Sequence, residues 1–125
     1  MARIAIVDDS RLARTVAVAT LRKAGHAVTE IEPVSLFDVL KALRNDPPDL
    51  LVTDYLMPGC SGLSLVRACH EEASLRGMKV LMVTAHHDDE IQERLLRVGV
   101  DRFLHKPFPP EILAAVADSL LAQED

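Results

Sequence analysis

The chain has 125 residues, of which 49% are hydrophobic and 26% charged, and its formal net charge is −5. This length fits one domain with its own core, and this composition is typical of a globular protein rather than a disordered one. No run of Lys and Arg exceeds two residues, and no apolar stretch approaches the about 20 residues that span a bilayer, which argues against direct nucleic-acid binding and against a membrane protein.

Short runs of strand-forming residues alternate five times with longer segments of helical periodicity. The predicted strands are residues 3–8, 27–31, 49–53, 79–83 and 100–105, and the predicted helices are residues 10–24, 34–45, 61–74, 88–97 and 109–122. Residues 80–83 are apolar without alternation, which is typical of a strand covered on both faces. This order predicts an α/β fold, a five-stranded parallel sheet wrapped by helices.

Local signals mark where several helices begin and end. Ser10 can cap the first predicted helix, and Asp88 or Asp89 can cap the fourth. Gly25 and Gly99 stand where helices should stop. The His-His-Asp-Asp run at 86–89 also suggests a transition-metal site, but neighbouring residues at a helix start rarely all point at one ion, so a loop and helix cap are favoured.

Helical spacing also predicts which side chains reach the core. The apolar stripes are Phe37, Leu40 and Leu43 in the second helix and Leu113, Val116, Ala117 and Leu120 in the fifth. Cys69 lies on the stripe of the third helix and is expected to be a buried, unreactive thiol. Cys60 lies in a Pro-Gly-Cys-Ser-Gly loop, which allows it to be exposed.

Polar side chains follow the ends of four predicted strands. Asp8 and Asp9 follow the first strand and Asp54 the third, while Thr84 ends the fourth and Lys106 follows the fifth. With right-handed crossovers, all of them lie at the carboxyl ends of the strands, where the ligand crevice of such a sheet is found. Gathered carboxylates bind a hard cation, and a cation beside a lysine and a hydroxyl is the chemistry of a phosphorylated aspartate.

Four motifs at these strand ends are specific in combination. They are Ile6-Val7-Asp8-Asp9-Ser10, Leu51-Val52-Thr53-Asp54-Tyr55-Leu56-Met57-Pro58, Met82-Val83-Thr84-Ala85 and Phe103-Leu104-His105-Lys106-Pro107-Phe108. In these motifs the chain resembles the receiver domain of two-component response regulators, over essentially its whole length, 1–125. The resemblance implies a flavodoxin-like, doubly wound (βα)5 fold with strand order 2-1-3-4-5.

The resemblance also implies a metal site and a phosphoacceptor. Asp54 would be the phosphoacceptor and a ligand of Mg²⁺ or Mn²⁺. Asp9 would bind the metal directly, Asp8 largely through water, and Leu56 through its backbone carbonyl. Such a mixed oxygen set with retained water suits Mg²⁺.

The resemblance gives further residues specific roles. Thr84 and Lys106 would bind the phosphoryl oxygens, and a cis Lys106–Pro107 bond would aim the ammonium inward. Phe103 would act with Thr84 as the aromatic switch. The side chains of Leu56 and His86 would flank the phosphoryl group and set its lifetime.

The function implied is that of a single-domain response regulator. It would take a phosphoryl group from a histidine kinase or a histidine phosphotransfer protein, and catalyse no reaction beyond its own phosphorylation and dephosphorylation. A downstream protein effector would bind the fourth helix, fifth strand and fifth helix, with the chain a monomer or a phosphorylation-dependent dimer. The N-terminus enters a strand pattern at once rather than a signal sequence, so the expected location is the cytoplasm.

Two other classes of function are alternatives to the receiver. An aspartate-nucleophile phosphatase would need a general acid or base two residues after Asp54, where this chain has Leu56, and turnover of phosphate monoesters would reveal it. A flavodoxin-like cofactor binder would need a phosphate-cradling loop rich in small and hydroxyl residues after the first strand, where Asp8 and Asp9 would instead repel a phosphate in the absence of metal. A yellow preparation would indicate that second class.

Overall fold

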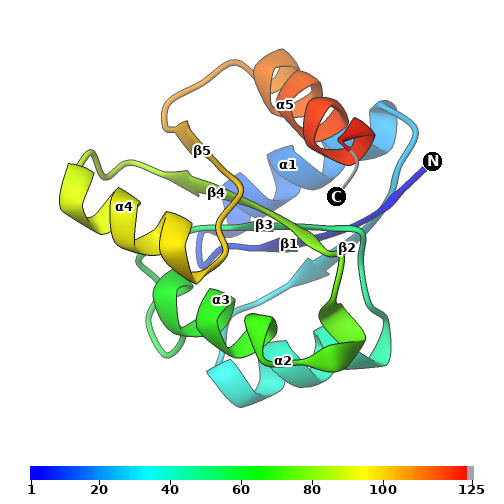
Figure 1. The fold of residues 1–125 in the computed structure, drawn as a ribbon. Coiled ribbons are helices and arrows are strands. Elements are labelled where there is room, and N and C mark those ends of the chain that lie inside the picture. Colours follow the sequence, from blue (N-terminus) through cyan, green and yellow to red (C-terminus); the bar gives the residue numbers. More distant parts are fainter. Residues whose placement is uncertain (124–125) are drawn as a thin grey trace.

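The computed structural model describes residues 1–123, which build one parallel sheet of five strands in the order β2-β1-β3-β4-β5 (Figure 1). The strands are β1 (Arg3–Val7), β2 (Ala27–Ile31), β3 (Leu50–Thr53), β4 (Lys79–Thr84) and β5 (Arg102–His105). The helices are α1 (Arg11–Lys23), α2 (Leu36–Asn45), α3 (Gly62–His70), α4 (Asp89–Val98) and α5 (Pro110–Ala122), with a 3-10 turn η1 (Ala73–Leu75). The predicted flavodoxin-like fold and strand order are confirmed.

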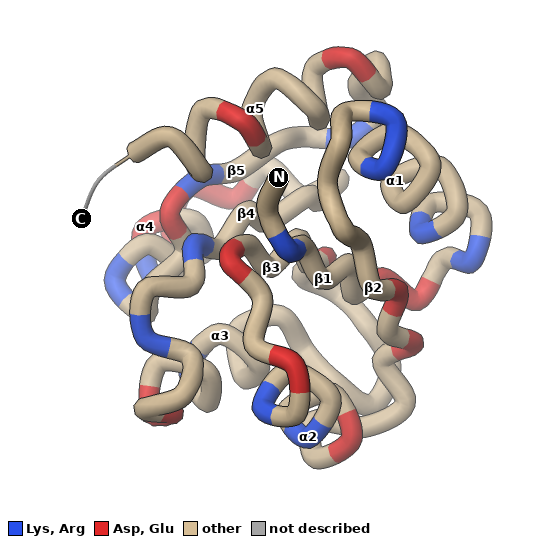
Figure 2. The backbone as a smooth tube through the Cα atoms, turned by 90° about the vertical axis from the view of Figure 1, so that its right-hand side faces the viewer, with Lys and Arg blue, Asp and Glu red and all other residues tan. Residues whose placement is uncertain are grey.

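Helices cover both faces of the sheet. Helices α1 and α5 lie on one face, and α2, α3 and α4 on the other; Figure 2 shows the strands from β2 to β5 between these layers. Each face has its own core because successive strand residues point to opposite sides. Ile6 packs with α1 and α5, and its neighbour Val7 packs with α2 and α3. No helix within residues 1–123 is both long and apolar enough to cross a membrane.

The predicted helix caps are largely confirmed. The Ser10 side chain accepts a hydrogen bond from Ala13 N and caps α1, and the Asp88 side chain accepts one from Ile91 N and caps α4. Gly99 ends α4 with a φ of 122°, a conformation that favours glycine. The prediction for the third helix was too long: α3 ends at His70, and η1 then buries Leu75 against the core.

One core prediction requires correction. Phe37 is 60% exposed, because α2 turns Val39 and Leu43 inward, with Leu36 and Leu40 packed beside them. The inward stripe therefore runs through Leu36 rather than through its neighbour Phe37. The four predicted core residues of α5 are all buried.

The two cysteines are both buried. Cys69 follows the prediction, whereas Cys60, which the loop sequence allowed to be exposed, is only 2% exposed and packs into the same core cluster. Burial raises the pKa of the Cys60 thiol. Burial, with smaller contributions from Cys60 and Glu72, raises the pKa of Cys69 to about 12. Because the thiolate is the reactive form, both side chains are inert packing residues at neutral pH.

Candidate functional site

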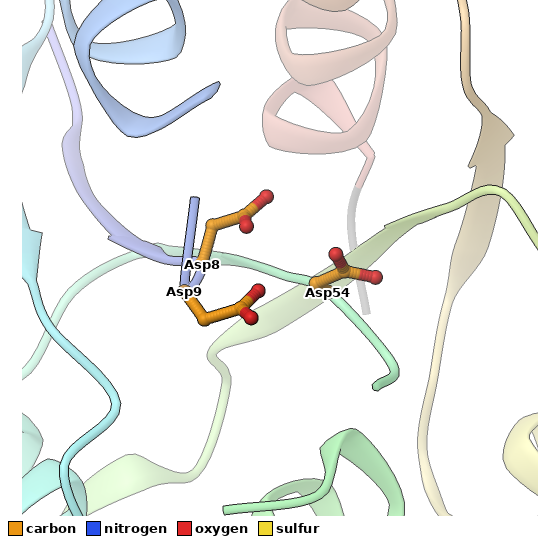
Figure 3. Close-up of side chains that lie close together, drawn as sticks. All are labelled: Asp8, Asp9 and Asp54. Atoms are coloured by element: carbon orange, nitrogen blue, oxygen red, sulfur yellow. The ribbon is translucent and has the colours of Figure 1, made fainter. Parts of the chain in front are cut away.

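Three carboxylates meet beyond the carboxyl ends of β1 and β3. The backbone N of Asp54 donates to Val7 O at 3.1 Å, which places Asp54 beside the start of the Asp8–Asp9 segment. Figure 3 shows the Asp8 and Asp9 side chains extending toward Asp54. One oxygen atom of each carboxylate lies within 4.8 Å of the other two. The adjacency of β1 and β3 therefore brings residues more than forty positions apart in the sequence into one cluster.

Lys106 joins this cluster from the end of β5. Its Nζ donates to Asp8 Oδ2 at 2.9 Å and to Asp54 Oδ2 at 3.0 Å. Its backbone N donates to Thr84 O at 2.9 Å, and the Lys106–Pro107 peptide bond is cis. Burial lowers the pKa of Lys106, but its hydrogen bonds and charge interactions with the two carboxylates outweigh burial, so the net pKa shift is upward. The side chain is therefore a cation at neutral pH.

The three carboxylates are held differently by the protein. Asp8 is 3% exposed, and its Oδ1 accepts a hydrogen bond from Ser10 N at 2.9 Å while its Oδ2 accepts one from Lys106. Asp54 Oδ1 accepts a hydrogen bond from Tyr55 N at 2.6 Å. Asp9 is exposed and has no hydrogen-bond partner among residues 1–123. Asp9 is thus the carboxylate most open to a direct ligand.

The donor set fits a hard divalent cation. It consists of carboxylate oxygens, the ligands that Mg²⁺ prefers, and the exposure of Asp9 gives access to the waters that Mg²⁺ retains. Within residues 1–123, Lys106 is the one cation whose side chain is hydrogen-bonded to the carboxylate groups of the cluster, which together carry three negative charges. A divalent cation would relieve this repulsion.

A glycine fixes the loop that follows Asp54. Gly62 N donates to Tyr55 O at 2.7 Å, which folds the loop back onto the end of β3. A Cβ added to Gly62 would lie 2.5 Å from Asp54 O and 2.9 Å from the side chain of Met82. Only glycine allows this approach, so the backbone beside Asp54 is set by close packing.

The remaining predicted residues lie on β4 and β5 and in the loops that follow β3 and β4. Thr84 is 3% exposed, and its Oγ1 accepts a hydrogen bond from His86 N at 3.2 Å. Phe103 is half-buried and packs against the core on the side of α2 and α3. Leu56 is 55% exposed in the loop after Asp54. The exposed His86 lies edge-on to the Tyr55 ring, with centroids 5.7 Å apart.

The histidines after β4 form no metal cluster with their neighbours. His87 stacks on His105 with centroids 4.2 Å apart, and Asp88 caps α4. Within the described part of the chain, Asp8, Asp9 and Asp54 are the one group of three or more His, Cys, Asp or Glu side chains with metal-binding spacing. The loop and helix-cap interpretation of residues 86–89 is supported.

Arg14 contacts the site and was not singled out from the sequence. It is 7% exposed, and its Nη1 donates to Asp8 O at 2.6 Å while its Nε donates to Glu30 Oε1 at 2.7 Å. A signal was present: positions 14, 18 and 21 form the buried stripe of α1, so the helical period places an arginine among apolar residues. A cation in that position requires a polar partner nearby.

Comparisons with known proteins agree with this geometry. The family model described as response regulator receiver domain matches residues 4–118. A phosphate regulon transcriptional regulatory protein PhoB from Klebsiella pneumoniae is 34% identical over 114 residues, which are 90% of this chain and 48% of that protein. The chain thus spans about half the length of the PhoB relatives it matches.

Other relatives match over nearly their full length. A chemotaxis protein CheY homolog from Campylobacter jejuni is 32% identical over 121 residues, covering 95% of this chain and 92% of that protein. The structure of the chemotaxis response regulator CheY4 of Vibrio cholerae superposes with a TM-score of 0.88 at 28% identity, covering 96% of this chain and 98% of that one.

Proposed function

The chain belongs to the response regulator receiver domain family, and from that premise we propose that it accepts a phosphoryl group on Asp54 from a histidine kinase or a histidine phosphotransfer protein. One observation carries the proposal: the Asp54 carboxylate lies within 4.8 Å of those of Asp8 and Asp9 and also accepts a hydrogen bond from Lys106. Incubation with a small acyl phosphate and Mg²⁺ tests it, because the intact mass should then rise by one phosphate.

Asp54 is the nucleophile in this proposal. Its carboxylate is held by Tyr55 N on one oxygen and by Lys106 on the other, so its direction is fixed before a donor arrives. A new bond forms between a carboxylate oxygen and phosphorus as the bond from phosphorus to the donor nitrogen breaks. The donor imidazole keeps the electron pair of that bond and takes a proton from solvent.

The cation site lies beside this nucleophile. Asp9 would hold Mg²⁺ or Mn²⁺ directly and Asp8 largely through water, and Asp54 and the Leu56 carbonyl would complete the protein ligands. When bound, the cation neutralises charge between the anionic carboxylate and the anionic donor. The burial of Asp8, which is 3% exposed, supports its indirect role together with the hydrogen bonds that its two oxygens accept from Ser10 and Lys106.

Two further groups bind the phosphoryl oxygens. Lys106 moves its ammonium from the Asp8 and Asp54 carboxylates to a phosphoryl oxygen. The Thr84 hydroxyl accepts from His86 N and still carries its own proton, which it donates to a second phosphoryl oxygen. These contacts turn a change of charge at Asp54 into a displacement at the end of β4.

Phosphorylation is expected to change the environment of Phe103. As Thr84 moves toward the phosphoryl group, the half-buried Phe103 ring turns into the space left behind and alters the effector surface of α4, β5 and α5. NMR spectra of the complex with a phosphate mimic should show shifts at Phe103 and along residues 89–105. In the Phe103→Leu control the shifts near Asp54 should persist, while those of α4 weaken. A mimic complex that shifts only the residues around Asp54 would contradict the switch.

Leu56→Asn is expected to shorten the lifetime of the phosphorylated state. Hydrolysis needs a water in line with phosphorus, and the apolar Leu56 side chain, which is 55% exposed beside Asp54, shields that approach. An asparagine offers a donor and an acceptor that orient water. The first-order decay after donor removal measures this in wild type, Leu56→Asn and His86→Ala. If the phosphorylated Leu56→Asn protein decays no faster than wild type, Leu56 does not shield the phosphoryl group. If the decay rate of His86→Ala is unchanged, His86 does not influence the lifetime.

The chain works as a receiver in the cytoplasm, as a monomer or as a dimer formed on phosphorylation. The partners are the phosphoryl donor and a protein effector on the face of α4, β5 and α5.

A further inference from the structure

Arg14 is the one charged side chain of α1 that the fold buries. It is 7% exposed on the stripe that it shares with Val18 and Leu21, and it points toward the sheet instead of solvent. Burying a guanidinium costs free energy unless its N–H groups and its charge find partners. Arg14 has partners for both: Asp8 O accepts a hydrogen bond from its Nη1 at 2.6 Å, and the Glu30 carboxylate accepts one from its Nε at 2.7 Å and balances its charge.

These two contacts connect three elements at the edge of the site. Arg14 lies in the first turn of α1, Asp8 follows β1, and Glu30 belongs to β2, where it pairs in register with Ile6. The planar guanidinium bonds both neighbours in fixed directions, which a lysine cannot do. The side chain therefore holds the start of α1 and the edge strand against the segment that carries the acidic pair.

The acceptor on Asp8 is its backbone carbonyl. That oxygen belongs to the peptide plane that joins Asp8 to Asp9, so a strong hydrogen bond to it fixes the orientation of the plane. The Asp8 side chain has other restraints, from Ser10 and Lys106. Asp9 has none within residues 1–123, so its direction depends on the backbone from which it leaves.

We infer that Arg14 is a positioning residue for the cation site: by holding the Asp8–Asp9 peptide it directs the Asp9 carboxylate toward the cation. The inference rests on the proposed function, since it presumes that Asp9 binds Mg²⁺. Arg14 touches neither the cation nor the phosphoryl group, and acts only through the backbone.

Charge alone predicts the opposite effect on affinity. A guanidinium close to a cation site repels the cation, and replacing it by a neutral side chain should then tighten binding. Loss of positioning should instead weaken binding, because groups that orient metal ligands typically contribute about 10–100-fold to affinity. The sign of the change therefore distinguishes the two effects.

The test compares Arg14→Met with Arg22→Met. Arg22 is a matched control, because it also lies in α1 and donates to a backbone carbonyl, Val28 O at 3.0 Å, but not to the acidic segment. Calorimetry and NMR titration with Mg²⁺ should show Arg14→Met binding at least about tenfold more weakly. Arg22→Met should bind as wild type does. The Asp9 amide should shift in the metal-free Arg14→Met protein and not in Arg22→Met.

Arg14→Lys keeps the test decisive if Arg14→Met does not fold. It retains the positive charge but cannot bond Asp8 O and Glu30 in the same geometry. If Arg14 acts by positioning, this variant should bind Mg²⁺ more weakly than wild type. If only its charge matters, the two affinities should be equal. Wild-type affinity in the folded Arg14→Lys protein, or tighter binding in Arg14→Met, would overturn the inference. Failure of the wild type itself to bind Mg²⁺ would instead refute the proposed function.

Discussion

Asp54→Asn is expected to abolish phosphorylation. An amide is neutral and is not a nucleophile toward phosphorus, but it has the shape of the carboxylate, and its one oxygen can still accept the hydrogen bond from either Tyr55 N or Lys106. The variant should therefore keep the fold and lose the chemistry. Intact mass after incubation with a small acyl phosphate and Mg²⁺ measures this: wild type gains one phosphate, and the variant gains none.

Asp49→Asn provides the control for that experiment. Asp49 lies directly before β3, whereas Asp54 lies directly after it, so the two residues are at opposite ends of the same strand. The Asp49 carboxylate accepts a hydrogen bond from Arg3 N at 2.8 Å. This variant should gain phosphate as wild type does. Acid-stable labelling that persists in Asp54→Asn would show that another residue of the chain is the phosphoacceptor.

Asp9→Ala is expected to lower the affinity for Mg²⁺ more than Asp8→Ala does. Asp9 is exposed and unpartnered within residues 1–123, whereas both oxygens of Asp8 accept from protein donors. A direct ligand matters more to a hard cation than one acting through water. Because even outer groups contribute about 10–100-fold, Asp9→Ala should weaken binding by more than about tenfold.

Asp46→Ala separates this effect from the change in net charge. Asp46 pairs with Arg3 at 3.1 Å, and its side chain is 56% exposed, so its loss changes the charge equally without touching the site. Calorimetric titration of the three variants and wild type decides the matter. Equal Mg²⁺ affinity in Asp9→Ala and wild type would show that Asp9 is not a ligand. A larger loss of Mg²⁺ affinity in Asp8→Ala than in Asp9→Ala would show that Asp8 is the direct ligand.

The convergence of the site residues could be predicted because it follows from topology. In a parallel sheet all carboxyl ends share one edge, so residues after the first, third and fifth strands must approach one another. Asp8, Asp54 and Lys106 do so, with hydrogen bonds of 2.9 and 3.0 Å from the lysine. The position of each residue relative to the strand end was sufficient for this prediction.

Other features depend on contacts that no local pattern records. The burial of Cys60 is one, because its loop is rich in turn residues and only packing against the core reveals that the thiol faces inward. The exposure of Phe37 is another, since the helical period alone allows a stripe through either Leu36 or Phe37. The bond from Arg14 to Asp8 O joins a side chain to a backbone atom, which residue types cannot specify.

Chemical trapping of the phosphorylated protein tests the assignment of Asp54 most directly. Borohydride reduces an aspartyl phosphate to homoserine, and peptide mapping then reports the position that carried the phosphate. After incubation of the wild type with an acyl phosphate and Mg²⁺, homoserine should appear at position 54, and chelation of the metal should prevent it. Homoserine at another aspartate, or a protein that gains no phosphate with Mg²⁺ present, would contradict the assignment of Asp54 as the phosphoacceptor.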